Sequence, residues 1–352
     1  MNSLLSNSLS NIFNKWQEYK DVIINLTTQD FNSSINVHGL KGSLNSYFIA
    51  DYCNTKKNKT LQSFQYNAAG YSSQTLKSKN NNIFSNGCEN LLVVVPTERD
   101  ADIVASDINA FFPEIEVSIL PGWGTVPYKS LPIGSITFGK RAGVFAKMLT
   151  QKNQVFIVTQ RVFQTPVPEP DYIKSLIFSL KVGNTIDTVQ IAVRGEFSLK
   201  GEVLDIFLPQ EPFPYRIVFD FDTIENIKSF DIDTQKTSEV VSGITVYPMK
   251  EILWDKQMVE KLNGIFDNYI EDSKRNDESI ESVCLPFSEQ AIQFKDNLIL
   301  NLFEKGESEG EELFYPLLWN RKYTILDYLD ESCTVVYYDY DKLENAQESL
   351  DR

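Results

Sequence analysis

Histidine and closely spaced cysteine are what this sequence of 352 residues lacks most clearly. His38 is its only histidine, and its four cysteines are scattered, with no CxxC pair among them. A zinc site needs several Cys or His ligands at short spacings, so the sequence predicts no metal site. We expect the cysteines to be reduced thiols without a special role: Cys53, Cys88, Cys284 and Cys333.

Long apolar runs are also missing. The longest, residues 91–95, has the length of a buried strand, whereas a transmembrane helix needs about 20 apolar residues. The N-terminus has no basic segment followed by a continuous apolar core, which is the pattern of a secretory signal peptide. These two absences predict a cytoplasmic protein with no membrane association.

Positive charge is the third shortage. Lys and Arg number 33 against 48 Asp and Glu, which gives a net charge of −15. Between Glu251 and Arg352 there are 24 acidic and 10 basic residues, a net charge of −14. Because a chain this acidic is repelled by phosphate backbones, the composition argues against a DNA-binding module, although it leaves room for a local basic patch.

The first half of the chain alternates between strand-like and helix-like patterns. Apolar runs predict strands at 35–37, 91–95, 116–120 and 155–158. Helical spacing predicts helices at 8–21, 44–53, 97–112 and 138–149, and the polar stretch 54–90 is expected to be irregular. This alternation predicts an α/β fold, with a parallel sheet covered by helices on its faces.

The pattern changes at a proline cluster, residues 165–170, which we interpret as a domain boundary. Short β-like runs then predict a small β-rich domain that ends near Gln235; they lie at 185–193, 203–207, 215–219 and 223–230. The acidic remainder is mixed, with helical spacing at 249–269 and 288–303 and a strand-like run at 334–338.

A glycine loop lies between the first predicted strand and the helix after it. A phosphate-binding P-loop reads GxxxxGK[ST], with a lysine that reaches the phosphates and a hydroxyl that binds Mg²⁺. Here the frame that starts at Gly39 and ends at Ser46 has Leu44 in place of the second glycine and Asn45 in place of the lysine. The loop residues concerned are Gly39, Lys41, Gly42, Ser43, Asn45 and Ser46.

The loss of that lysine removes the main positive charge for transition-state stabilisation, and Lys41 comes too early to replace it. We therefore expect no ATPase activity and no catalytic residue in this chain. Two interpretations of the loop stay open: a strand-to-helix turn of purely structural use, and nucleotide binding without hydrolysis.

Three segments carry a resemblance to a known family. They are the degenerate loop at 39–43, the segment LPGWGTVPY at 120–128, and RGEFSLKGEVLDIF at 194–207 with its continuation to residue 237. Together they make the chain similar to the N-terminal region of bacterial transcription-repair coupling factors (Mfd), which is homologous to the excision nuclease subunit UvrB. The third segment is hard to obtain by chance.

This resemblance implies a helicase-like, Rossmann-type domain with a degenerate P-loop, split by an inserted small β-rich α+β domain as in UvrB. Residues 1–165 and 236–352 are then the two parts of the α/β region, and 166–235 is the inserted, UvrA-binding domain. Family members recruit UvrA and so link a stalled RNA polymerase to nucleotide excision repair. The domains that bind RNA polymerase and translocate DNA with ATP and Mg²⁺ lie further along the full protein, so we expect a monomeric fragment without a cofactor.

The resemblance also indicates which residues contact UvrA. Relatives use two arginines of an FRVRG turn, and these positions fall on Ser198 and Lys200. Lysine keeps the charge but loses the bidentate fork of arginine. A further family arginine falls near Ile186 or Asp187, so that part of the pattern is missing. The predicted contact residues are Lys200, Arg194, Phe197, Ser198 and Arg216.

Alternatives remain for these residues and for the chain. Lys200 and Arg194 have the composition of an interface anchor beside Phe197, but they could equally be solvated charges that pair with Glu196 and Glu202. An ATP-dependent helicase-like enzyme is the second functional hypothesis, and a DNA-binding module is the third. The missing lysine and the net charge favour the first hypothesis, a non-enzymatic module that docks UvrA.

Overall fold

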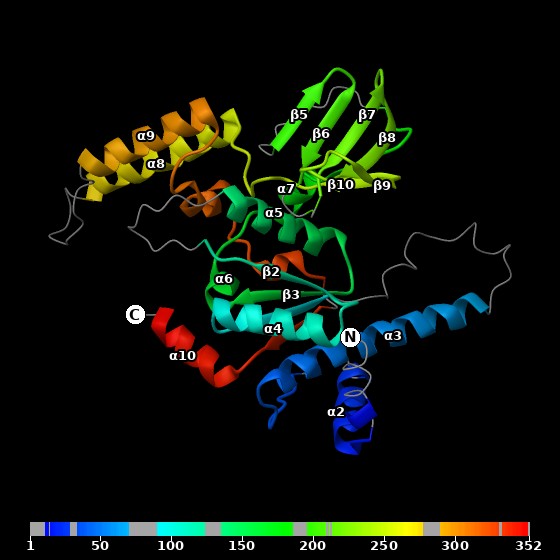
Figure 1. Ribbon diagram of the computed structural model, residues 1–352. Helices are drawn as coiled ribbons and strands as arrows, with labels where there is room; N and C mark the ends of the chain where they lie inside the picture. The colour runs from blue at the N-terminus through cyan, green and yellow to red at the C-terminus, as the bar shows by residue number, and fades with distance from the viewer. Residues whose placement is uncertain are drawn as a thin grey trace. The chain divides into compact units, whose positions relative to one another are not determined.

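The computed structural model describes most of the chain (Figure 1). The described residues are 11–13, 15–28, 34–69, 90–123, 135–185, 196–208, 211, 213–276, 289–330 and 333–350. They form two compact units. Unit 1 comprises Met1–Gly122, Lys147–Gln164 and Asp327–Arg352, and unit 2 comprises Trp123–Ala146 and Thr165–Leu326.

Unit 1 is built on a four-stranded parallel sheet in the order β11-β1-β3-β2. Its strands are β1 (Leu91–Val95), β2 (Glu116–Leu120), β3 (Gln154–Thr159) and β11 (Thr334–Tyr337). Every residue of β1 and β3 is buried, as expected for inner strands covered on both faces. The predicted parallel sheet is confirmed, and β11 joins it from a part of the chain that follows unit 2 in sequence.

Helices accompany this sheet, and two of them differ from the sequence prediction. The helix expected at 8–21 lies instead at α2 (Gln17–Thr28), after a short helical stretch at 11–13. The helix expected at 44–53 continues as α3 (Ser43–Ala69), so the prediction that residues 54–69 are irregular is wrong. The remaining helices of unit 1 are α4 (Glu98–Phe111), α6 (Gln160–Gln164) and α10 (Tyr340–Leu350), whereas α5 (Ser135–Thr150) belongs to unit 2 as far as Ala146.

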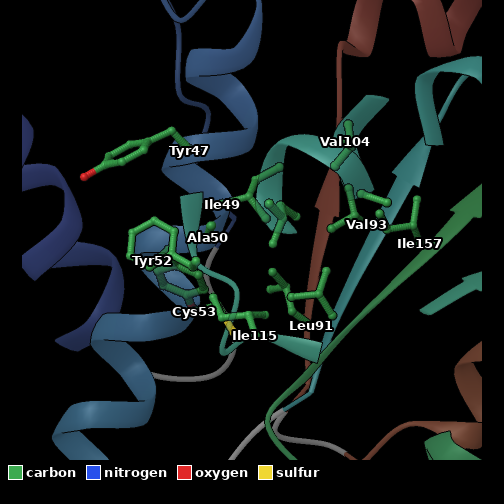
Figure 2. Packing of buried hydrophobic residues seen from close by; sticks show 14 of the residues in the cluster. Tyr47, Ile49, Ala50, Tyr52, Cys53, Leu91, Val93, Val104, Ile115 and Ile157 are labelled. Atoms are coloured by element: carbon green, nitrogen blue, oxygen red, sulfur yellow. The ribbon is translucent and has the colours of Figure 1, made fainter. Parts of the chain in front are cut away.

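Local chemistry explains where α4 begins. The side chain of Thr97 accepts a hydrogen bond from the Asp100 backbone N–H at 3.2 Å, which satisfies one free donor of the first turn. Val104 and Ile108 follow at helical spacing and are fully buried in the core of unit 1. Figure 2 shows Ile49, Ala50 and Cys53 of α3 in the same core.

Unit 2 contains a five-stranded antiparallel sheet in the order β5-β6-β7-β8-β9. Its strands are β5 (Glu196–Lys200), β6 (Val203–Phe207), β7 (Tyr215–Asp220), β8 (Thr223–Phe230) and β9 (Thr237–Val241). A two-stranded antiparallel sheet of β4 (Phe178–Lys181) and β10 (Gly243–Val246) shares its core. The β-rich region therefore runs to Val246, beyond the end predicted near Gln235, because β9 and β10 return to pair with earlier strands.

The rest of unit 2 is helical. Its elements include α7 (Pro170–Ser175), α8 (Lys256–Asn276), α9 (Glu289–Lys305), η2 (Glu311–Leu313) and η3 (Tyr315–Leu318), and η4 (Ile325–Tyr328) lies where the two units meet in sequence. A buried ion pair joins Arg141 of α5 to Glu251. Burial raises the pKa of the Glu251 carboxyl, and the Arg141 guanidinium opposes that shift. Arg141 also lies 4.0 Å from the centre of the Trp123 ring.

Candidate functional site

The described residues before the glycine loop do not form the strand that a P-loop needs. Residues 34–38 form no regular structure, and Ile35 and Val37 are 40% and 38% exposed, so the strand predicted at 35–37 is wrong. Gly39 and Gly42 have positive φ angles of 91° and 58°, with no atom within 4 Å of where their Cβ atoms would lie. A P-loop holds phosphate because a strand fixes its backbone N–H groups around the anion. This loop has the glycines and the following helix without that support.

The polar residues of the loop do not converge on one point. Lys41, Gly42 and Ser43 are exposed, whereas Ser46 is fully buried in the first turns of α3. The Ser46 hydroxyl has no hydrogen-bond partner among the described residues. The Asn45 backbone N–H donates to the Gly42 carbonyl at 3.1 Å, which closes the turn. A buried hydroxyl is not placed to ligate Mg²⁺ at an exposed loop.

The residues predicted to bind UvrA lie mainly on the hairpin of β5 and β6. Lys200 pairs with Val203 and Ser198 with Asp205, so a two-residue loop, Gly201-Glu202, joins the strands. Gly201 has a φ of 59°, the conformation that a tight hairpin turn requires at its first central residue. The turn thus fixes the register of β5.

Lys200 is an exposed, uncompensated cation on an edge strand. Ser198, Leu199 and Lys200 are all exposed, and Lys200 has no ion-pair partner in the described part of the chain. Residues directly opposite in neighbouring strands project from the same face of a sheet. The pairing Ser198–Asp205–Arg216–Lys228 therefore defines one outward row, and Lys200 lies on that face two residues along β5.

Arg216, another predicted contact, is engaged within the sheet. Its Nε and Nη2 atoms each donate to a carboxylate oxygen of Asp205 at 2.7 Å, a bidentate arrangement. Nη2 also donates to Gln235 at 3.2 Å, and the guanidinium lies 4.6 Å from the centre of the Phe230 ring. The hydrogen bond to Asp205 raises the pKa of Arg216. Arg216 is therefore not a free cation, unlike Lys200.

Two predicted contact residues fall wholly or partly outside the described structure. Arg194 lies outside the described residues. Phe197 is described in its backbone, where it pairs with Ile206, but not in its side chain. Among the predicted set, the structure thus brings Ser198, Lys200 and Arg216 to one face of the sheet.

Sequence reasoning missed a second turn at the same end of the sheet. Asp220 pairs with Thr223, so Phe221-Asp222 is another two-residue loop. Phe221 has a φ of 52° and is 86% exposed. The Phe219 backbone N–H donates to the Glu202 carbonyl at 2.8 Å, which places the two turns side by side (Figure 1). The short spacing between two apolar strands was the only signal in the sequence.

The described residues hold neither a metal site nor a membrane span. No group of three or more His, Cys, Asp or Glu among them could hold a metal ion. None of the described helices is both long and apolar enough to cross a bilayer.

The region just described is similar to known proteins. Residues 180–252 match the UvrB interaction domain family. Over 75% of its length the chain is 25% identical to a transcription-repair-coupling factor of Haemophilus influenzae, and over 69% it is 24% identical to that of Rickettsia typhi. It is also 26% identical, over 70% of its length, to UvrABC system protein B of Kosmotoga olearia.

The matches cover 22% and 21% of the two coupling factors and 42% of the UvrABC protein, so the chain spans about a fifth of the length of these coupling factors. The resemblance stated from the sequence is confirmed. This chain is similar to the transcription-repair-coupling factors along most of its length, and its residues 180–252 match the model of the UvrB interaction domain family.

Proposed function

We propose that this chain is a non-catalytic recognition module of a transcription-repair coupling factor, and that it recruits UvrA through the outward face of β5 and β6. One observation carries the proposal. The segment that matches the UvrB interaction domain family coincides with the sheet that displays Lys200 as an exposed, uncompensated cation on a fixed hairpin. A rigid backbone lowers the entropic cost of using such a side chain in an interface.

The glycine loop supports the non-catalytic part of the proposal. It has Asn45 where an ATPase needs lysine, the described residues 34–38 before it form no strand, and its terminal hydroxyl is buried. We propose that ATP, Mg²⁺, RNA polymerase and DNA are bound by downstream domains of the full-length protein, an ATP-dependent DNA translocase, and that this region is a monomer that links stalled polymerase to nucleotide excision repair.

The test is a binding titration of the purified chain with UvrA from the same organism. We expect wild type to bind and Lys200→Glu to bind at least tenfold more weakly, which corresponds to about 1.4 kcal/mol. Lys236→Glu is the matched control, because it makes the same charge change at the opposite end of the sheet, where Lys236 is exposed.

Two results would overturn the proposal. The absence of binding by the wild-type chain would refute UvrA recruitment. ATP turnover by the purified chain, lost on Ser46→Ala or Lys41→Ala, would refute the non-catalytic role and restore the enzyme hypothesis.

A further inference from the structure

The two hairpin turns at one end of the β5–β9 sheet share a backbone conformation but not a residue type. Gly201 has a φ of 59° and Phe221 a φ of 52°, and each is the first residue of a two-residue loop. Glycine adopts this conformation without penalty because it has no Cβ atom. A bulky aromatic residue there is a true outlier, and such local strain persists chiefly where function uses it.

Folding does not explain why a phenylalanine occupies this position. The Phe221 side chain is 86% exposed, the highest value among the large apolar residues that the structure describes as exposed. It contributes no buried area to the core of the sheet, which is formed by residues such as Ile217, Ile224 and Ile227. Phe221 therefore combines backbone strain with an apolar surface left in water, and neither stabilises the free protein.

The surroundings of Phe221 indicate which kind of surface would receive it. Asp220 and Asp222 flank it, and Glu202 lies on the neighbouring turn; all three are exposed and have no ion-pair partner among the described residues. Lys200, an exposed cation, precedes Glu202 by two residues at the start of that turn. An exposed aromatic side chain flanked by carboxylate residues is complementary to an apolar pocket bordered by Lys or Arg side chains.

We propose that Phe221 is an anchor of the UvrA interface, inserting into an apolar pocket of UvrA whose rim is basic where it meets Asp220 and Asp222, while Lys200 contacts an acidic group of the same protein from the adjacent turn. This inference rests on the proposed function and adds to it a second residue and the chemistry of the receiving surface. Aromatic anchors of this kind dominate binding energy in interfaces, whereas peripheral charges mainly affect association rate and salt dependence.

The test compares UvrA binding of Phe221→Gly, Phe221→Asn and Phe221→Trp with wild type. Glycine and asparagine tolerate the positive φ but remove the ring, so we expect at least tenfold weaker binding with an unchanged or raised thermal midpoint. Tryptophan keeps an aromatic anchor, so we expect binding within about threefold of wild type. Asp222→Asn should reduce the dependence of the association rate on salt.

Asn153→Gly is the matched control. Asn153 also has a positive φ, 61°, but lies in unit 1, outside the segment that matches the UvrB interaction domain family, so relief of its strain should leave UvrA binding unchanged. If wild type binds and the glycine and asparagine variants bind equally well, the role of Phe221 is refuted while the proposed function stands. If wild type does not bind, the proposed function itself fails.

A measurement on the wild-type chain covers the case in which the variants do not fold. Hydrogen–deuterium exchange should show residues 219–224 protected when UvrA is added. Binding of UvrA without protection of this turn would overturn the inference.

Discussion

The glycine loop and the β5–β6 turn each place an exposed lysine next to a glycine of positive φ, but only the β5–β6 turn is flanked by paired strands. Lys41 lies between Gly39 and Gly42, in a loop whose described preceding residues, 34–38, form no strand. Lys200 precedes Gly201 in a turn whose flanking strands are paired residue by residue. A lysine beside a glycine therefore does not by itself identify a binding site. The paired strands that hold the lysine in place distinguish the β5–β6 turn.

A cavity in the core of the β5–β9 sheet should have the largest effect on stability and on UvrA binding. Ile217 is fully buried at the centre of the β5–β9 sheet, so Ile217→Ala should reduce the free energy of unfolding by about 2–5 kcal/mol and weaken UvrA binding with it. Val37→Ala, beside the other turn, should cost under about 0.5 kcal/mol because Val37 is 38% exposed. Denaturant titration of both variants checks this. Equal losses in the free energy of unfolding would mean that the structure around the two turns is equally well packed.

The ion pair of Arg216 and Asp205 tests whether Arg216, unlike Lys200, serves the stability of the sheet. Both side chains are about a third exposed or less, so Arg216→Ala should cost about 1–2 kcal/mol after solvent screening. Asp205→Asn should cost a similar amount and the double variant little more, since one interaction is lost in each case. Chemical denaturation of the three variants measures this coupling. Weaker UvrA binding by Arg216→Ala, with no loss of stability, would instead make Arg216 a direct contact.

The glycines themselves provide the next test. Gly201→Ala and Gly39→Ala each place a Cβ atom in the left-handed region without a steric clash, so each should cost about 1–2 kcal/mol from strain alone. Only Gly201→Ala should also lower UvrA affinity, because its strain falls on the turn that displays Lys200. A loss of UvrA affinity in Gly39→Ala would contradict the assignment of UvrA binding to the β5–β6 turn alone.

The smallest effect concerns the helix that follows the glycine loop. Burial raises the pKa of the Cys53 thiol to about 11, and Lys56 and Lys57 only partly offset this. At pH 8, below both the ordinary and the raised pKa, the thiolate fraction of Cys53 should be about 100-fold lower than that of an exposed thiol. Labelling of Cys53 should therefore be slow, and its rate should rise about tenfold per pH unit up to pH 11. Rapid labelling would show that α3 leaves the core readily.

Part of this fold could be predicted because some signals are local. The runs that became β1 and β3 are continuously apolar, and Thr97 marks the start of α4 by capping it. The predicted strand at 35–37 failed because two apolar residues do not bury a strand unless a neighbour pairs with it. Residues 54–69 were misjudged because their Asn, Lys and Gln content is typical of loops, although the backbone continues the helix.

The candidate site was predictable only where it depended on sequence similarity. The resemblance led to Lys200 and Ser198, and the structure places both on the exposed edge strand β5. The pairing of Arg216 with Asp205 depends on strand register across β6 and β7, which the sequence does not contain. Phe221 was missed because a positive φ at a non-glycine residue is set by the hairpin and not by local preference.

The most direct test of the distinction between the two turns is a side-by-side measurement of UvrA affinity for Lys200→Glu and Lys41→Glu. Both residues are exposed and both variants make the same charge change. We predict at least a tenfold loss of affinity for Lys200→Glu and no change for Lys41→Glu. Equal losses for the two variants, or a loss for Lys41→Glu alone, would contradict the assignment of recognition to the β5–β6 hairpin.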